Sequence, residues 1–536
     1  MKFIVVTGGV MSGLGKGITA STTGLLLKNM GLTVTVVKID PYLNVDAGTM
    51  SPYEHGECYV LDDGSEVDLD LGNYERFLGI TLTGKSSITT GKVYQKVITK
   101  ERAGEYLGKT VQIVPHLTNE IISMLEEVCH DKIDGKVPDV CIIEMGGTIG
   151  DIEGLPFIEA LRQMVNLHDM CFIHLSMLVQ SGNELKTKPT QTSLKELNRN
   201  GIFPNILCIR TPVEFSDDIR KKLSMFCQVS QDMIICNTNV KSIYDVPILF
   251  SSQFLGEKVC MVLKLLPIES AKLLDTYNYI SSRVPIKTVR CIIVGKYTES
   301  NDTYLSIIRA LEHASISINI HVDVVYIAGE DVDNNSITLE ELLTPDDVVI
   351  IPGGFGTRGT NGMLKTIEHC RLNNISILGI CFGFQLMVIQ LCRNIGLLNA
   401  DSEEILPKEY LTNVVHMVDT DSTEMGGTMR LGSHLCNITP GSMVHSLYKT
   451  DTIMERHRHR YEVDRDKIKR TLEYSYQKLD VDNIVKFVST SIHKNHTIYE
   501  ILEIKDHKFF VGCQFHPEFL SRLEKPHPLF VGLLNR

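Results

Sequence analysis

A chain of 536 residues with 43% hydrophobic and 22% charged residues has the composition of ordinary folded proteins and can build two or more sizeable cores. Its net charge of −12 argues against a general nucleic-acid-binding protein. The 14 cysteines include no C-x-x-C pair, so we expect buried, reduced thiols rather than disulfides or a zinc framework. No apolar run predicts a signal peptide or a membrane span, and the expected location is cytoplasmic.

The first half of the chain alternates β-branched runs with helix-patterned segments. The predicted strands are Phe3–Thr7, Thr33–Ile39, Val140–Glu144, Cys171–Leu175 and Ile206–Arg210. This rhythm predicts a mostly parallel sheet with helices on both faces. Ligands of such folds bind in the loops at the carboxyl ends of the strands.

A glycine-rich loop follows the first of these strands and precedes a helix. Residues 7–17 read TGGVMSGLGKG. Backbone N–H groups of such a loop cradle phosphates, and Lys16 adds a mobile positive charge. The loop departs from a strict P-loop, since Val10 replaces the first glycine and Gly17 replaces the hydroxyl residue that holds Mg²⁺. The alternative is a turn needed only for close packing, but the well-placed lysine favours phosphate binding.

Two acidic residues are candidates to replace the missing hydroxyl as Mg²⁺ ligands. Glu144 ends a buried strand, where a carboxylate is unfavourable unless it meets a cation. Asp70 is the second candidate, although a solvated turn residue is nearly as good an interpretation. Lys38 ends the second strand and is expected to reach a transferring phosphoryl group, with a surface lysine as the alternative. Further along, the polar loop 184–191 suits a second triphosphate and a polar base.

The alternating pattern weakens near Pro267 and resumes with a strand at Val289–Gly295. We therefore predict a first domain at 1–266, a linker at 267–288 and a second α/β domain at 289–536. Further strands are expected at Asp323–Ile327, Val348–Ile351, Ile375–Leu378 and Phe509–Gln514.

The second half contains a candidate cysteine nucleophile. Residues 378–383 read LGICFG, in which glycines nearly flank Cys381 at the junction of a strand and a helix. This pattern predicts a nucleophile elbow, with the thiol at a helix N-terminus that favours the thiolate. His516 and Glu518 are two residues apart on a predicted strand, so their side chains would share a face. The sequence thus predicts a Cys-His-Glu acyl-transfer site.

Taken together, these residues resemble the CTP synthase family, glutamine-dependent ligases that amidate UTP. The resemblance extends over nearly the whole chain. Its most specific stretches are 40–46, 51–57, 68–77, 150–153, 186–191 and 455–463. It implies a P-loop-like synthetase domain followed by a class I glutamine amidotransferase domain. The implied reaction uses ATP to phosphorylate the C4 oxygen of UTP, which ammonia from glutamine then displaces.

The resemblance also implies roles for individual residues. Lys16 and Lys38 would act on the ATP γ-phosphate, Asp70 and Glu144 would hold Mg²⁺, and Cys381, His516 and Glu518 would form the glutaminase triad. The implied ATP site comprises Gly13, Leu14, Gly15, Lys16, Gly17, Ile18, Asp70, Asn239 and Val240. The implied UTP and inhibitory CTP site comprises Ser12, Asp151, Ile152, Glu153, Lys186, Thr187, Lys188, Pro189, Thr190, Gln191 and Lys222. The implied glutamine site comprises Gly354, Phe382, Gly383, Phe384, Gln385, Glu404 and Arg460.

Regulation and assembly are implied in the same way. Arg358 and the stretch 426–432 resemble parts of a GTP-activation site, and His55 with Cys58 would line the ammonia passage. A homotetramer that can stack into filaments is expected, without nucleic-acid or membrane partners. Gly13, Asn239 and Cys58 depart from residues seen in some members, and none of them removes a group that the reaction requires.

Three alternatives remain from the residues themselves. A related amidoligase would use a carboxylate acceptor, which loop 186–191 and residues 151–153 disfavour. A partitioning-type ATPase switch would leave the Cys-His-Glu site unexplained. The third alternative takes residues 456–460 as a nucleic-acid patch, which the net charge opposes, or takes His457 and His459 as metal ligands, for which the sequence offers no third ligand.

Overall fold

The computed structural model describes residues 1–11, 13–182, 184–267, 273–405, 413–418, 429–464, 466–468, 485–493 and 496–536. Contacts divide the chain into two compact units. The first contains residues 1–47 and 70–283, and the second contains residues 48–69 and 284–536.

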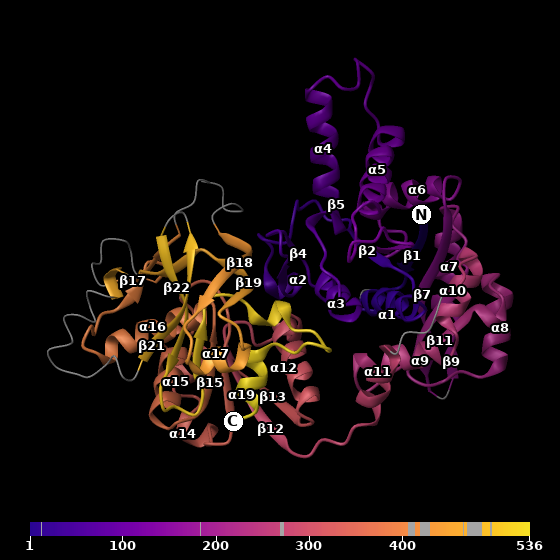
Figure 1. Ribbon diagram of the computed structural model, residues 1–536. Coiled ribbons are helices and arrows are strands. Elements are labelled where there is room, and N and C mark those ends of the chain that lie inside the picture. The colour runs from indigo at the N-terminus through magenta and orange to yellow at the C-terminus, as the bar shows by residue number, and fades with distance from the viewer. Residues whose placement is uncertain are drawn as a thin grey trace. The chain divides into compact units, whose positions relative to one another are not determined.

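The first unit is built on a seven-stranded parallel sheet of order β11-β10-β7-β1-β6-β2-β5 (Figure 1). Its strands are β1 (Lys2–Gly8), β2 (Val34–Asp40), β5 (Ser87–Thr89), β6 (Val140–Met145), β7 (Asp169–Met177), β10 (Ile206–Thr211) and β11 (Ile234–Thr238). A two-stranded ribbon adds β8 (Val179–Ser181) and β9 (Glu184–Lys186). The five strands expected in this half are confirmed. Their continuous runs of Val, Ile and Cys suit strands that are buried on both faces.

Helices cover both faces of this sheet. They are α1 (Lys16–Asn29), α3 (Leu69–Leu78), α4 (Thr90–Arg102), α5 (Thr118–Val128), α6 (Leu155–Met164), α7 (Lys188–Arg199), α8 (Asp217–Cys227), α9 (Val246–Ser251), α10 (Leu255–Leu263) and α11 (Leu273–Ser282). Phe3 and Val5 pack with α5 and α6 in one core cluster. In Figure 1, α4 and α5 project from the sheet of this unit.

The second unit contains a nine-stranded sheet of order β13-β12-β14-β15-β23-β22-β21-β18-β19. Neighbours from β13 to β23 are parallel, and the remaining pairs are antiparallel. The strands are β12 (Thr288–Gly295), β13 (His321–Ala328), β14 (Val348–Ile351), β15 (Ser376–Ile380), β18 (Arg430–Ile438), β19 (Thr452–His459), β21 (Val485–His493), β22 (His496–Ile504) and β23 (Phe510–Cys513). A smaller sheet contains β16 (Asp401–Ser402), β17 (Asn413–Met417) and β20 (Tyr461–Val463).

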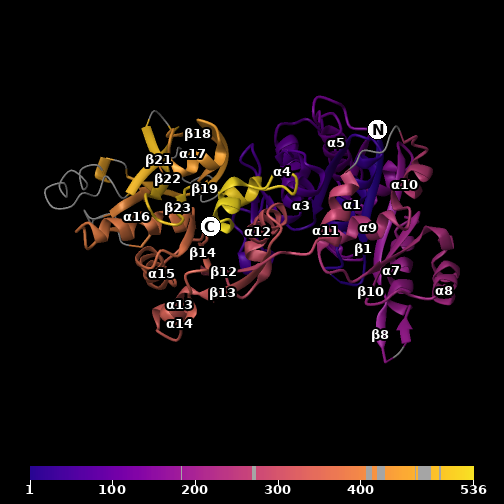
Figure 2. The ribbon, with the colours of Figure 1, turned by 60° about the horizontal axis from the view of Figure 1, so that its bottom comes forward.

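Two hydrophobic clusters fill the two sides of the larger sheet. The helices are α12 (Leu305–Ser317), α13 (Gly329–Asp333), α14 (Leu339–Leu342), α15 (Thr360–Leu372), α16 (Phe382–Asn394), α17 (Met443–Tyr448) and α19 (Pro528–Leu534). In Figures 1 and 2, α15 and α16 lie to one side of the parallel strands and α12 lies to the other.

Residues 48–69, which we expected in the first domain, group with the second unit. They form α2 (Pro52–His55), β3 (Cys58–Val60) and β4 (Glu66–Asp68). Hydrogen bonds explain the grouping: the Tyr59 hydroxyl donates to the Phe519 carbonyl at 2.8 Å, and Arg456 Nε donates to Asp62 at 2.5 Å. The expected linker also contains helix α11, whose Tyr277 packs near Phe77 with ring centroids 6.3 Å apart.

Among the described residues, no single helix has the length and hydrophobicity to cross a membrane. One bent pair, Ile243–Ser251 with Leu255–Leu263, passes the same test only when joined across a 61° bend.

Candidate functional site

The glycine-rich loop joins β1 to α1 in the first unit. Gly13 and Gly15 have φ values of +73° and +93°, a region that side chains disfavour, so glycine is favoured at both positions. Lys16 begins α1, and its Nζ donates to the Gly147 carbonyl at 2.7 Å. Leu14 is buried, Ile18 is half-buried, and Ser12 lies outside the described residues. The loop and the lysine thus combine at the N-terminus of a helix, as phosphate binding requires.

Gly17 occupies the position where a P-loop carries a hydroxyl residue, and its missing side chain has a structural reason. A Cβ built on Gly17 would overlap Asp70 Oδ1 and would lie 3.4 Å from Glu144 Oε2. The Asp70 carboxylate therefore fills the space that a serine or threonine side chain would need. Asp70 lies in the first turn of α3, and Glu144 lies on β6.

Lys38 connects these two carboxylates. Its Nζ donates to Asp70 Oδ2 and, at 2.9 Å, to Glu144 Oε1. Burial lowers the pKa of Lys38, but Asp70 and Glu144 outweigh it and hold this pKa well above its usual value. Burial and the neighbouring Asp70 raise the pKa of Glu144. Burial also lowers the pKa of Lys16, and Lys38 adds to that effect, although Glu144 opposes it. Two carboxylates and two lysines thus share one partly buried site at the carboxyl edge of the sheet.

A pocket of about 410 Å³ borders this loop, and its lining includes Val10, Ile149, Lys188 and Pro189. Lys188 and Pro189 begin α7. The structure thus brings part of the predicted UTP segment, which begins a helix rather than lying in a loop, next to the glycine-rich loop.

The other predicted UTP residues are placed as follows. Asp151 accepts a hydrogen bond from Thr148 N at 3.1 Å, whereas Ile152 and Glu153 are exposed. Thr190 donates to the Met177 carbonyl at 2.8 Å, and Gln191 donates to Thr187 at 3.0 Å. Lys186 forms an ion pair with Glu184. Lys186, with a smaller effect from Lys222 of α8, lowers the pKa of the Glu184 carboxyl. Asn239 and Val240 directly follow β11 at the same edge of the sheet.

Sequence analysis missed a buried histidine beneath the glycine-rich loop. His174 Nδ1 lies 2.9 Å from Thr7 Oγ1, and His174 Nε2 lies 2.6 Å from Ser193 Oγ. Burial, with a smaller effect from Lys16, lowers the pKa of His174 to about 3, so the imidazole is neutral. It links β1, β7 and α7, which no local pattern in the sequence indicates.

In the second unit, Cys381 has the predicted elbow geometry. Its φ and ψ are 54° and −100°, and it is the N-cap residue of α16. The flanking glycines are sterically required: a Cβ on Gly379 would lie 2.7 Å from Met387 Sδ, and one on Gly383 would overlap the Ile351 carbonyl oxygen. The thiol donates to the Arg458 carbonyl at 3.5 Å.

His516 and Glu518 form the expected pair, although the predicted strand is wrong. Strand β23 ends at Cys513, and Pro517–Leu520 form a 3-10 helix with His516 as its N-cap residue. The proline and the turn, rather than strand alternation, bring His516 Nδ1 to 2.7 Å from Glu518 Oε1. Burial lowers the pKa of His516, but Glu518 and then Cys381 outweigh it and raise this pKa to about 10.

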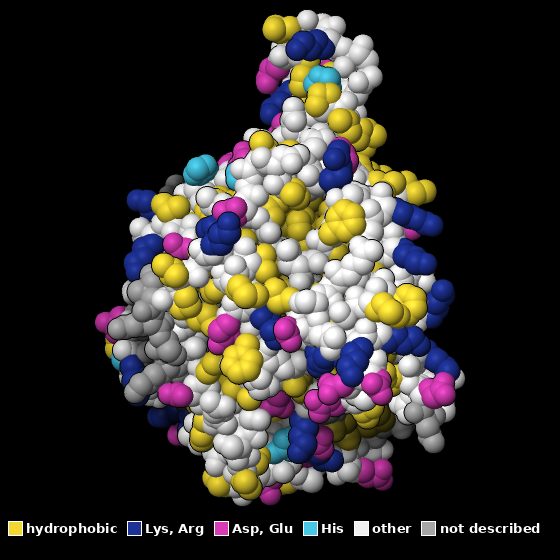
Figure 3. Space-filling view, turned by 90° about the vertical axis from the view of Figure 1, so that its right-hand side faces the viewer, with side chains coloured by type: hydrophobic (Ala, Val, Ile, Leu, Met, Phe, Trp, Pro, Cys, Tyr) yellow, Lys and Arg dark blue, Asp and Glu magenta, His cyan; other side chains and the backbone are white. Residues whose placement is uncertain are grey.

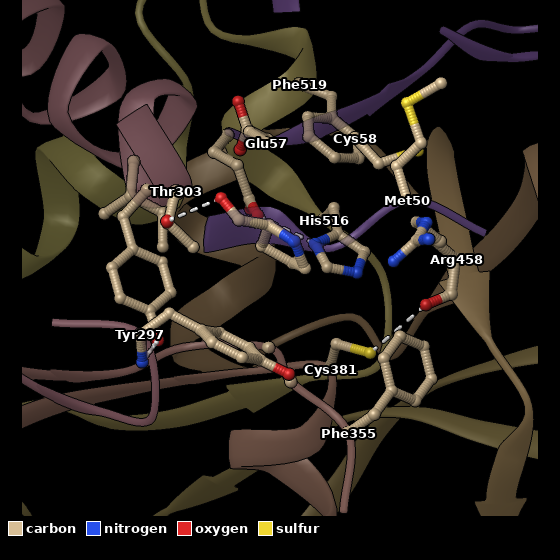
Figure 4. Close-up of a pocket in the computed structure, with 16 residues that line it drawn as sticks. Met50, Glu57, Cys58, Tyr297, Thr303, Phe355, Cys381, Arg458, His516 and Phe519 are labelled. Carbon is tan, nitrogen blue, oxygen red and sulfur yellow. Dashed lines mark hydrogen bonds and ion pairs between the residues drawn. The ribbon is translucent and has the colours of Figure 1, made fainter. Parts of the chain in front are cut away.

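Cys381 and His516 line one pocket of about 90 Å³, drawn in Figure 4. Gly354 lies in the lining and directly follows the Pro352-Gly353 pair after β14. Cys58 also lines this pocket, whereas His55 is not among its lining residues. Sequence analysis missed Tyr297, Phe355 and Arg458 as lining residues of this pocket. The Arg458 backbone carbonyl also accepts the hydrogen bond from the Cys381 thiol.

The remaining predicted glutamine residues surround this region. Glu404 Oε1 accepts from Gly356 N at 2.6 Å, and the Arg460 guanidinium lies 5.8 Å from the Phe355 ring centroid. Phe382, Gly383 and Phe384 are buried in α16. The Gln385 amide is directed to the Tyr461 carbonyl at 2.7 Å, so it holds β20 against α16.

His457 and His459, the alternative metal ligands of the sequence analysis, are both buried. His457 does lie within ligand distance of Cys436 and Glu500. However, Arg430 forms an ion pair with Glu500 at 2.7 Å, and His457 Nε2 lies 3.0 Å from the same carboxylate. A guanidinium at this position supplies the positive charge that the carboxylate needs.

Comparisons with known proteins agree with both units. The family model described as "CTP synthase N-terminus" matches residues 2–265, and that of "Glutamine amidotransferase class-I" matches residues 300–535. The CTP synthase of Dictyostelium discoideum is 45% identical, with 100% of this chain and 98% of the relative covered. The CTP synthase of Archaeoglobus fulgidus is 44% identical, with the same coverage, and that of Drosophila melanogaster is 43% identical, with 100% and 87% covered.

A solved structure, the glutaminase domain of Trypanosoma brucei CTPS with bound acivicin, is 32% identical. It covers 46% of this chain and 92% of that chain, with a TM-score of 0.41. Because these relatives match the whole chain and are CTP synthases, the two alternative interpretations, a carboxylate amidoligase and an ATPase switch, are rejected. The chain belongs to the CTP synthase family, glutamine-dependent ligases that convert UTP to CTP.

Proposed function

We propose that this reaction is divided between a phosphoryl-transfer site at Lys16 and Lys38 and a glutaminase site at Cys381. The single observation that carries the proposal is the glutaminase geometry: a thiol at a helix N-terminus, with a buried His516–Glu518 pair lining the same pocket. We also propose the domain limits 1–266 and 289–536, apart from residues 48–69.

In the glutaminase site, Cys381 attacks the amide carbon of glutamine. His516, protonated because of Glu518, donates its proton to the departing ammonia, and water then releases glutamate. Backbone N–H groups of Gly354 and Phe382 bind the oxyanion. Glu404 and Arg460 bind the amino and carboxylate ends of glutamine, while Gly383, Phe384 and Gln385 shape the pocket.

In the phosphoryl-transfer site, residues 12–18 bind the ATP phosphates, and Asn239 with Val240 borders the adenine. Lys16 and Lys38 offset the charge of the transferring group. UTP, and CTP as an inhibitor, bind at Ser12, residues 151–153, residues 186–191 and Lys222. The pocket shared by Val10 and α7 supports this assignment, because it adjoins the phosphate loop.

Asp70 and Glu144 fit an Mg²⁺ ion. Both are oxygen donors, which Mg²⁺ prefers, and Gly17 leaves room for Asp70 where a hydroxyl ligand would otherwise stand. The bound ion would supply positive charge to the phosphate oxygens. Lys38, which now pairs with both carboxylates, would then be released toward the transferring phosphoryl group.

Regulation, assembly and location are part of the same proposal. Arg358 contributes to GTP activation, while residues 426–428 lie outside the described residues. The projection formed by α4 and its connection to α5 exposes Tyr94, Ile98, Leu107 and Ile113, which supports a homotetramer that stacks into filaments (Figure 3). All 14 cysteines are free thiols, which supports a cytoplasmic location.

The test measures CTP formation from UTP, ATP and Mg²⁺ with GTP present, in parallel with glutamine and with ammonium chloride. Wild-type protein is expected to use both nitrogen sources. Cys381→Ala is expected to lose synthesis from glutamine and to retain synthesis from ammonia, because its phosphoryl-transfer site is intact. Loss of both activities in a folded Cys381→Ala protein would refute the two-site proposal.

A further inference from the structure

Lys296 is a buried lysine beside the glutaminase pocket for which the reaction gives no role. It directly follows β12 and is only 3% exposed. A buried ammonium is unfavourable unless it meets acceptors. Its Nζ donates to the carbonyl of Phe355 at 3.2 Å and to that of Gly356, and it lies 3.9 Å from the centroid of the Phe382 ring.

These contacts adjoin both predicted halves of the oxyanion hole. In a nucleophile elbow, one N–H donor comes from the residue after the nucleophile and the other from a neighbouring loop. Here the first is Phe382, over whose ring the ammonium lies, and the second is Gly354. The stem of Lys296 packs under that glycine, since a Cβ built on Gly354 would lie 3.4 Å from Lys296 Cδ. One side chain therefore contacts both segments.

We propose that Lys296 is a positioning residue of the glutaminase site, which fixes the Gly354–Gly356 loop against Phe382 and places a positive charge behind the oxyanion. This inference rests on the proposed role of Cys381. The charge is most useful when the oxygen becomes negative, so it lowers the barrier to amide attack more than it strengthens glutamine binding. Lys296 should therefore affect kcat and leave KM for glutamine nearly unchanged.

The local charges make this role depend on pH. Burial lowers the pKa of Lys296 to about 8; Glu404 and Glu330 oppose this effect, and Arg358 adds to it. These three groups come from the loop after β16, from α13 and from the loop before α15, whereas α16 contributes the uncharged Phe382. Because the protonated form is the one that acts, kcat for glutamine hydrolysis should fall as the pH rises through about 8.

The test compares Lys296→Met, which removes the charge but keeps the length, with Lys296→Arg, which keeps the charge at alkaline pH. The matched control is Lys365→Met on α15, whose side chain is 47% exposed. Glutamine hydrolysis is measured from pH 6.5 to 9.5 with all nucleotides present. Lys296→Met should lower kcat roughly 10- to 100-fold, change KM by less than about threefold and abolish the decline near pH 8. Lys296→Arg should keep a higher kcat than Lys296→Met and also lack that decline.

Ammonia-dependent synthesis provides the internal reference, and all three variants should retain it. A Lys296→Met protein with the wild-type kcat and the wild-type pH profile would overturn the inference. A rise in KM alone would also overturn it, since Lys296 would then bind the substrate. If Cys381→Ala still hydrolyses glutamine, the proposed function itself fails; if only the Lys296 variants behave as wild type, this inference alone fails.

Discussion

The proposed phosphate site and the proposed glutaminase site occupy equivalent places in two different sheets. Each follows a parallel strand and precedes a helix: β1 and α1 in one case, β15 and α16 in the other. The glutaminase site is organised by the backbone. Cys381 has a positive φ, and Gly383 contacts a neighbouring strand so closely that no Cβ fits. The reactive group is thus positioned before any substrate arrives.

The phosphate site is instead organised by charges that satisfy one another. Lys38 pairs with Asp70 and Glu144, and the Tyr74 hydroxyl also donates to Glu144. In the proposed function, nucleotide binding exchanges these partners. A nucleophile can thus be held by strain and close packing, whereas a phosphate site needs charges that are free to change partners.

Two buried histidines, one in each unit, differ in their partners and in their charge. His516 has a carboxylate at 2.7 Å, and its pKa is raised to about 10. His174 has only hydroxyl partners, and burial lowers its pKa to about 3. The nearest neighbour, rather than burial alone, decides which of the two is charged at neutral pH.

The largest effect should come from Lys16→Ala. Removing this cation from the transferring phosphoryl group should lower CTP synthesis at least ~10³-fold with either nitrogen source. The measurement is CTP formation with glutamine and with ammonia. Lys132→Ala, at an exposed position of the same unit, is the control and should behave as wild type. Ammonia-dependent turnover that survives in Lys16→Ala would contradict the phosphate assignment.

Glu518→Gln should affect only one of the two sites. Without the carboxylate, burial dominates, the pKa of His516 falls, and the imidazole loses its orientation. Glutamine-dependent synthesis should drop roughly 10²- to 10³-fold, while ammonia-dependent synthesis stays unchanged. Glu524→Gln, at an exposed position, is the matched control. Equal losses with both nitrogen sources would show that the two sites are not separable.

Gly17→Ala tests whether the position of the Asp70 carboxylate depends on the missing side chain of this glycine. The added Cβ would displace the Asp70 carboxylate and should reduce synthesis from both nitrogen sources about 10-fold, with a weaker apparent affinity for Mg²⁺. The control is Gly24→Ala in the same helix, whose Cβ would meet a Leu78 methyl at 2.8 Å. That change should lower the unfolding temperature but leave the Mg²⁺ dependence unaltered. An identical Mg²⁺ response in both variants would refute the role of Gly17.

The smallest effect concerns stability and pH. The folded-state pKa of His174, about 3, lies below its unfolded value of about 6.5. The associated stability is therefore fully present above about pH 6.5 and is lost as the pH falls toward 3, because the unfolded chain binds the proton. At pH 5 the loss amounts to about 2 kcal/mol. His174→Gln should reduce the decrease in unfolding temperature between pH 7.5 and 5, whereas His130→Gln, at an exposed position, should not.

Local sequence patterns predicted five of the seven strands of the first sheet, all but β5 and β11, and the five parallel strands of the second sheet, because continuous β-branched runs and glycine punctuation encode them directly. The elbow at Cys381 was equally readable, since the glycines required by crowding lie close to it in the chain. Helix α11 was missed because its short segment, next to prolines, carries only a weak periodicity. The His516–Glu518 contact was correctly expected for a wrong reason, because Pro517 starts a 3-10 helix immediately after β23.

The sequence alone was enough to predict the main parallel strands, the glycine-rich loop, the cysteine elbow and the family. These depend on residues that are neighbours in the chain. Three features depend on the fold of the whole chain: residues 48–69 pack within the second unit, Asp70 fills the space left by Gly17, and Lys296 lies against Phe382. Such contacts join segments far apart in sequence, and their free energy comes from burial and charge pairing that no local pattern records.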